Sequence, residues 1–185
     1  MQDTRGEFYE EVVIAGFGGQ GIILAAVILG RAAALYDGKH AVQTQVYGPE
    51  ARGGASMSAV IIDEEPIFYP EVSVPDIYVI MSQEGFERYG AKAPKEAVML
   101  IDSDMVEGRP ACTYREIPAT SEARTTLGRV IVANIVMLGA LVAATGIVSE
   151  GAIGKAVLDS VPKGTEKLNM SALEKGMELV RARKG

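Results

Sequence analysis

The first two thirds of the chain alternate between short apolar runs and segments rich in glycine, proline and acidic residues. Apolar runs of four to eight residues that are rich in β-branched side chains are typical of buried strands. We predict strands over residues 11–15, 40–46, 55–63, 76–82, 98–102 and 112–117, with an edge strand at 67–69. Two alanine-rich or amphipathic stretches, residues 22–36 and 83–89, predict helices between these strands.

From Ala119 onward the apolar residues recur with a helical period, which predicts about three further helices. The longest apolar run, Val130 to Ala144, is shorter than the ~20 residues of a membrane span and contains Asn134. It is therefore interpreted as a buried helix, and no membrane association is expected.

The order of these elements predicts one α/β domain spanning residues 1–185, a three-layer α/β/α sandwich with a helical C-terminal part. The sheet should be mixed but mostly parallel. Residues 55–69 are the expected antiparallel members, because the connection there is too short for a crossover helix.

Composition narrows the possible functions. Lysine and arginine total 18 against 24 acidic residues, a net charge of −6, which argues against nucleic-acid binding. The single cysteine, Cys112, cannot form an internal disulfide, a zinc cage or an iron–sulfur cluster, and His40 is the lone histidine. With a polar start at Met1–Glu7 and no signal-peptide core, a cytoplasmic location is expected.

The first candidate site is the string Gly16-Phe17-Gly18-Gly19-Gln20-Gly21, between a predicted strand and a predicted helix. It matches the dinucleotide-binding pattern G-x-G-x-x-G, in which glycines admit a close ligand and the helix N-terminus offers free N–H groups. A ribose-binding acid should close the next strand, but Gln43 to Tyr47 contains none. A tight turn with close packing is an equally good interpretation.

The second candidate is the loop Tyr47-Gly48-Pro49-Glu50-Ala51-Arg52-Gly53-Gly54. Arg52 beside bare backbone could hold a carboxylate or phosphate, or it could pair with Glu50 and only shape the loop. Since loops at the carboxyl ends of strands converge in such sheets, both glycine segments should meet at one crevice. Ser82-Gln83-Glu84 should belong to the same rim.

Other polar residues receive no catalytic role. Cys112 is expected to pack as a small side chain, His40 has no partner pattern, and no nucleophile elbow G-x-S-x-G occurs. The cluster Asp102-Ser103-Asp104 with Glu107 is interpreted as a solvated turn rather than a magnesium site. The residues thus predict an anion-binding crevice without complete catalytic machinery.

With both glycine segments in view, the chain resembles the gamma subunits of the 2-oxoacid:ferredoxin oxidoreductase family. The resemblance covers residues 10 to 178 and is carried most specifically by the two loops at this spacing. It continues through Tyr69-Pro70, Val74-Pro75-Asp76, Ser82–Phe86, Asn134, Leu138-Gly139-Ala140 and Asn169–Gly176.

The resemblance implies a subunit that is inactive alone and binds no cofactor tightly. In the family, complexes convert a 2-oxoacid and coenzyme A (CoA) to an acyl-CoA and CO2 while reducing ferredoxin. Thiamine diphosphate with Mg and the iron–sulfur clusters would lie on partner subunits: alpha, beta and a ferredoxin-like delta. The residues that would bind CoA or dock a partner are Gly16, Gly18, Gly19, Gln20, Gly21, Tyr47, Glu50, Arg52, Gly53 and Gly54.

The second loop most resembles the 2-oxoglutarate branch, which implies succinyl-CoA as product. Pyruvate, branched-chain 2-oxoacids and indolepyruvate remain alternative substrates. A free-standing nucleotide-binding oxidoreductase using Gly16 to Gly21, and a purely structural subunit, are the alternatives from other functional classes.

Overall fold

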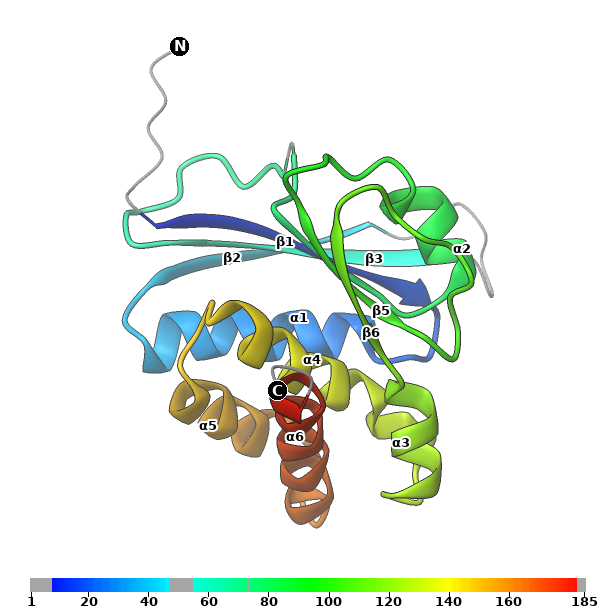
Figure 1. Ribbon diagram of the computed structural model, residues 1–185. Coiled ribbons are helices and arrows are strands. Elements are labelled where there is room, and N and C mark those ends of the chain that lie inside the picture. The colour runs from blue at the N-terminus through cyan, green and yellow to red at the C-terminus, as the bar shows by residue number, and fades with distance from the viewer. Residues whose placement is uncertain (1–7, 47–54, 73, 183–185) are drawn as a thin grey trace.

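The computed structural model describes residues 8–46, 55–72 and 74–182, and its strands form one mixed sheet. The strand order is β2-β3-β1-β4-β5-β6 (Figure 1). The strands are β1 (Tyr9–Phe17), β2 (His40–Val46), β3 (Ala55–Asp63), β4 (Ile77–Ile80), β5 (Val98–Asp102) and β6 (Thr113–Ile117).

Of the described strands, β3 alone runs against the others. It pairs antiparallel with β1 on one side and with β2 on the other, whereas β1, β4, β5 and β6 pair in parallel. The eight residues between β2 and β3 cannot supply a crossover helix, so the chain must reverse direction there. The prediction of a mixed, mostly parallel sheet with an antiparallel strand at 55–63 is confirmed.

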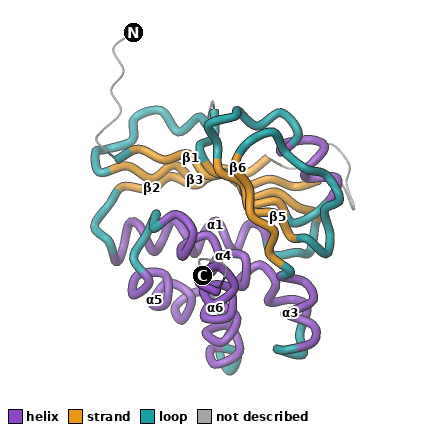
Figure 2. Tube along the Cα trace, in the orientation of Figure 1, coloured by secondary structure: helices purple, strands orange, loops and turns teal. Residues whose placement is uncertain are grey.

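One face of the sheet is covered by a thick helical layer, shown in Figures 1 and 2 below the strands. Its helices are α1 (Ile22–Arg31, continued by a π-helical turn, Ala32–Tyr36), α3 (Ala119–Thr125), α4 (Ala133–Thr145), α5 (Glu150–Ser160) and α6 (Glu166–Arg181). A short 3-10 turn, Val130–Val132, precedes α4. Ten consecutive residues of α4, 133–142, are buried, which confirms the buried helix predicted for this run.

The opposite face is covered more thinly, by α2 (Gln83–Gly85), a π-helical turn (Phe86–Gly90) and loops (Figure 2). Val12 and Ile14 of β1 face the helical layer, and Val13 and Ala15 face the thin layer. Because both faces are buried, the strands contain continuous apolar runs rather than alternating ones. The three-layer α/β/α fold is confirmed, with outer layers of unequal thickness.

Two predictions about elements are wrong. Ile67–Tyr69 is a described segment without strand structure, because its Phe68 and Tyr69 are exposed and no neighbouring strand edge pairs with it. The region after Ala119 contains four described α-helices instead of about three, since Ala119–Thr125 forms its own short helix. Among the described residues, no helix is both long and apolar enough to cross a membrane.

Candidate functional site

The glycine segment forms a tight turn that joins β1 to α1. Gly19 and Gly21 have φ angles of 97° and 74°, in the left-handed region that side chains with a Cβ disfavour. Gly21 is also the N-cap of α1 and has no side chain to satisfy the first backbone N–H groups of the helix. Those groups are the donors that an anion at a helix N-terminus uses.

Gln20 ties the turn to the neighbouring strand. Its Oε1 accepts a hydrogen bond from the Phe17 N–H at 2.9 Å, and its Nε2 donates to the carbonyl oxygen of Met81 at 2.7 Å. The side chain therefore bridges the carboxyl ends of β1 and β4, the point where the strand order changes direction. A Cβ at Gly16 would collide with Oε1 of Gln20.

Other glycines of this region admit close neighbours. Asn134, which is 3% exposed and comes from α4, donates through Nδ2 to the Gly21 carbonyl at 3.0 Å. A Cβ at Gly21 would collide with that amide. A Cβ at Gly85 would lie 3.2 Å from backbone atoms of Ala15 and Gly16. Close packing therefore accounts for Gly16, Gly21 and Gly85.

Gly18 and Gly19 are different, because their side-chain positions face open space. No described atom lies within 4 Å of a Cβ built on either residue. Their backbone is thus the part of the turn that a ligand or a partner protein can approach.

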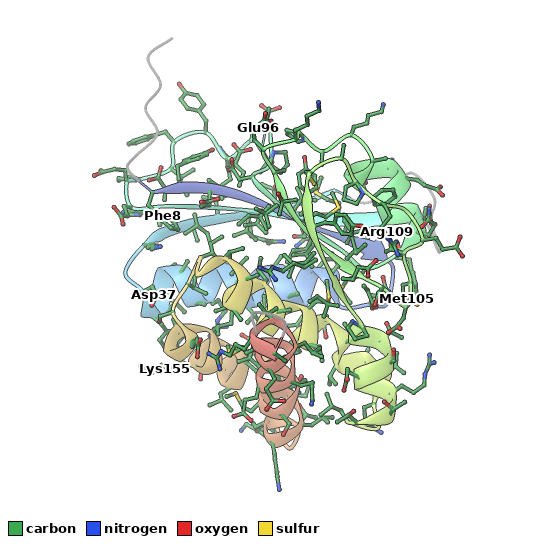
Figure 3. All side chains as sticks on the ribbon, viewed as in Figure 1. Phe8, Asp37, Glu96, Met105, Arg109 and Lys155 are labelled. Carbon is green, nitrogen blue, oxygen red and sulfur yellow. The ribbon has the colours of Figure 1, made fainter. Side chains whose placement is uncertain are left out.

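A hollow of about 410 Å³ adjoins the turn. Its walls are mainly apolar and include three exposed large hydrophobic residues, Phe17 (36%), Val130 (44%) and Ile131 (62%). Arg124, near the end of α3, adds a cation. The remaining lining residues are Gly19, Gln20, Met81, Met105, Thr120 and Ala133. Figure 3 shows Met105 on the side of the molecule where α3 begins, away from Phe8 and Asp37.

The second predicted loop, with Tyr47, Glu50, Arg52, Gly53 and Gly54, lies outside the described residues. The residue after it, Ala55, is the register partner of Phe17 in the glycine turn. The Ala55 N–H also donates to Oε1 of Glu84 at 2.9 Å.

Ser82, Gln83 and Glu84 complete this rim. Oγ of Ser82 accepts the Gly85 N–H at 3.0 Å and begins α2, while Oε1 of Gln83 accepts the N–H groups of Glu107 and Gly108. Together with the contact between Glu84 and Ala55, this confirms that the segment lies on the same rim as the glycine turn.

The interpretation of Asp102 as part of a solvated turn is wrong. Its side chain is fully buried, and its carboxylate accepts hydrogen bonds from Oγ1 of Thr120 at 2.6 Å and from the Asp104 N–H at 3.1 Å. Burial raises the pKa of the Asp102 carboxyl above its ordinary value, although the hydrogen bonds oppose that shift. Asp102 and the exposed Asp104 fix the start of α3, on which Arg124 lies.

Cys112 is 7% exposed and packs in the thin layer, where burial raises the pKa of its thiol. The prediction that Cys112 packs as a small side chain is confirmed. Among residues 8–46, 55–72 and 74–182, no three His, Cys, Asp or Glu side chains are grouped so that they could hold a metal ion.

The sequence did not predict roles for Asn134, Arg124 or the exposed pair Val130 and Ile131. Asn134 carried a signal, because it is the one strongly polar residue in the apolar run 130–144. Arg124, Val130 and Ile131 line the hollow because α3 and the 3-10 turn pack beside the sheet, which the sequence does not reveal.

Residues 11–179 match a protein family described as pyruvate ferredoxin/flavodoxin oxidoreductase. The chain belongs to this family. It is 52% identical over 185 residues to the 2-oxoglutarate synthase subunit KorC of Methanocaldococcus jannaschii, covering 98% of this chain and 99% of that relative. This confirms the resemblance drawn from the two glycine segments.

A solved structure supports the assignment. The gamma subunit of a keto/oxoacid ferredoxin oxidoreductase from Geobacter sulfurreducens PCA is 44% identical and superposes with a TM-score of 0.84, over 94% of this chain and 99% of that one.

Two relatives from Methanothermobacter thermautotrophicus are less similar. The ketoisovalerate oxidoreductase subunit VorA is 34% identical over 95% of this chain but only 37% of its own length. The pyruvate synthase subunit PorC is 34% identical over 91% of this chain and 94% of its own.

Proposed function

We propose that this chain is the gamma-type subunit of a 2-oxoglutarate:ferredoxin oxidoreductase. The complex would convert 2-oxoglutarate, CoA and oxidised ferredoxin to succinyl-CoA, CO2 and reduced ferredoxin. The observation that carries the proposal is the difference in identity between branches, 52% to a 2-oxoglutarate synthase subunit against 34% to a pyruvate synthase subunit over similar coverage.

The chemistry would be divided among subunits, with residues 1–185 acting as one non-catalytic domain. An iron–sulfur cluster takes several thiolate ligands, and this chain offers one cysteine, which is buried. Its residues therefore do not fit a cluster. Thiamine diphosphate with Mg, and the clusters, are assigned to the alpha, beta and ferredoxin-like delta subunits, with ferredoxin as the electron acceptor.

The glycine turn and the hollow beside it are proposed to enclose CoA or to dock a neighbouring subunit. Open backbone at Gly18 and Gly19, free N–H groups at the start of α1 and the Arg124 guanidinium suit phosphate groups. Exposed Phe17 and Ile131 offer apolar surface beside them. Tyr47, Glu50, Arg52, Gly53 and Gly54 belong to the same proposal through the position of Ala55.

The substrate is tested with the complex reconstituted from its co-produced subunits. CoA-dependent reduction of a viologen dye should be fastest with 2-oxoglutarate and at least tenfold slower with pyruvate, 2-ketoisovalerate or indolepyruvate. Preference for another 2-oxoacid would keep the family and refute the 2-oxoglutarate assignment. Turnover by the isolated chain would refute the non-catalytic role.

Substitutions in the same complex distinguish CoA binding from subunit docking at this site. Arg124→Ala and Arg52→Ala should raise the KM for CoA about tenfold if these cations hold its phosphates, as expected for a charge-assisted hydrogen bond. Arg88→Ala, an exposed cation on the Phe86–Gly90 turn, is the matched control and should leave the KM unchanged. Loss of partner subunits from the purified complex, with an unchanged KM, would instead assign the site to docking.

A further inference from the structure

The segment between β3 and β4, Glu64–Asp76, carries the most exposed large hydrophobic side chains among the described residues. Phe68 is 81% exposed and Tyr69 is 85% exposed, and Val74 in the same segment is 53% exposed. The segment runs over the side of the sheet opposite the helical layer (Figure 1). Two adjacent aromatic rings this exposed bury little apolar surface in this fold, and aromatic residues are enriched where proteins bind one another.

Buried carboxylates hold both ends of this segment in place. Glu11 of β1 is 1% exposed, and its carboxylate accepts hydrogen bonds from the Val74 N–H at 3.1 Å and the Tyr9 hydroxyl at 2.7 Å. At the other end, Oδ1 of Asp63, which is 4% exposed, accepts the Glu65 N–H at 2.9 Å. The aromatic pair is thus presented from a segment with fixed ends, which reduces the entropy that binding would remove.

The charge of the segment restricts what can bind it. Glu64, Glu65 and Glu71 are exposed, and residues 64–76 contain no lysine or arginine. A two-fold contact between copies of this segment would oppose like charges within a chain whose net charge is already −6. The complementary surface is an apolar pocket edged by lysine or arginine.

The lengths of the relatives indicate where such a surface would come from. The match to this chain covers only 37% of VorA, which is longer, but 99% of KorC. Contacts that VorA makes within one polypeptide would have to form between separate subunits in a protein with a chain as short as this one.

We propose that Phe68 and Tyr69 are the anchors by which this chain docks into a basic-edged apolar pocket on another subunit of its oxidoreductase complex. The inference rests on the proposed function, and it assigns the contact to the β3–β4 segment rather than to the glycine turn.

The test uses the full tagged chain co-produced with the other subunits, and it measures the molar amount of each subunit captured per tagged chain. Phe68→Ser with Tyr69→Ser should lower the capture of at least one subunit tenfold or more. Leu35→Ser with Leu158→Ser removes two exposed apolar side chains from the helical layer and should stay within twofold of the unchanged chain. Glu64→Lys with Glu71→Lys keeps both rings and should also weaken capture, more strongly at low salt.

Each remaining result contradicts the inference in a recognisable way. Capture of every subunit at the unchanged ratio by the Phe68 and Tyr69 variant would overturn the docking role and leave the proposed function standing. If the unchanged isolated chain is a dimer by light scattering and this variant is a monomer, the occupant is a second copy and the inference is wrong. If the unchanged chain captures no subunit and shows no 2-oxoacid oxidation, the proposed function itself fails.

Discussion

At the residue scale, the position of the Gln20 side chain explains why a glycine is needed at position 16 of the turn. The carboxamide accepts from Phe17 and donates to Met81, so it occupies the space above Gly16 that a Cβ would fill. A dinucleotide-binding turn uses its glycines to admit a ligand, whereas here a protein side chain takes that space at Gly16. Only Gly18 and Gly19 keep the open backbone that the ligand pattern requires.

We predict opposite results for two alanine substitutions in this turn. Gly16→Ala should lower the free energy of unfolding by about 1–3 kcal/mol because the new methyl group overpacks the site, whereas Gly18→Ala should change it by less than about 0.5 kcal/mol. Urea unfolding of both variants measures the difference. Combining Gly16→Ala with Gln20→Ala should recover part of the loss, and strict additivity of the two substitutions would contradict the proposed contact.

Asp102 predicts a pH dependence with a definite sign. Burial raises the pKa of this carboxyl in the folded state, so the folded protein holds the proton more tightly than the unfolded chain does. The unfolding free energy contributed by this group therefore falls as pH rises from the ordinary pKa of an aspartate through the raised one.

Asp102→Asn removes that titration. The difference in unfolding free energy between the variant and the unchanged protein should therefore shift in favour of the variant as pH rises from the ordinary pKa of an aspartate through the raised one. Urea unfolding at each pH measures this difference. Thr120→Val deletes a hydrogen bond that favours the ionised form, so it should raise the pKa further and extend the fall to higher pH. A constant difference between Asp102→Asn and the unchanged protein at every pH would refute the assignment.

At the scale of elements, the contact between α4 and α6 depends on two glycines that allow the helix backbones to meet. A Cβ at Gly139 would collide with the carbonyl of Leu173, and a Cβ at Gly176 with the carbonyl of Val136. The close approach places α4 between the sheet and α6, and Asn134 at its first turn reaches the glycine turn from there. The packing of two C-terminal helices thus positions one wall of the candidate site.

Substituting these helix glycines should therefore reverse the usual effect of Gly→Ala. Gly139→Ala and Gly176→Ala should each lower the unfolding free energy by about 1–3 kcal/mol, despite the better helix propensity of alanine. Gly151→Ala in α5, where no described atom lies within 4 Å of the added methyl group, should raise it by about 0.5–1 kcal/mol. Thermal unfolding should give shifts of opposite sign, and stabilisation by Gly139→Ala would exclude the close contact.

At the scale of the whole molecule, an acidic chain is expected to contribute to an anion site without forming one alone. The net charge is −6, so attraction for the phosphates of CoA must come from local N–H groups, from single arginines and from basic partners. The hollow beside the Gly16–Gly21 turn has exposed Phe17 and Ile131 in its walls, so the chain by itself leaves this apolar surface open to water.

We predict that the isolated chain binds CoA weakly or not at all, and that NAD, NADP and FAD give no thermal shift. The reconstituted complex should bind CoA, and isothermal calorimetry on the chain and on the complex compares the two. Low-micromolar CoA binding by the isolated chain would contradict the shared site. A thermal shift with a dinucleotide would instead favour the free-standing nucleotide-binding oxidoreductase.

The sequence by itself determined most of the elements, because their signals are local. Apolar runs such as residues 55–63 and 98–102 have the strand bounds that the structure shows. Ile67–Tyr69 has the composition of a strand, but a strand needs a neighbouring edge to pair with, and that depends on residues distant in sequence. The burial of Asp102 also depends on residues distant in sequence, because α3, which covers it, begins seventeen residues later.

The candidate site shows the same division. The two glycine segments and their order after strands were visible in the sequence, and so was the family. Which glycines are packed and which are open was decided by Gln20, Asn134 and the backbone near Gly85, whose approach follows from tertiary packing. Local propensity and chain length govern which elements form, whereas the space around each side chain is set by elements that only the folded structure brings together.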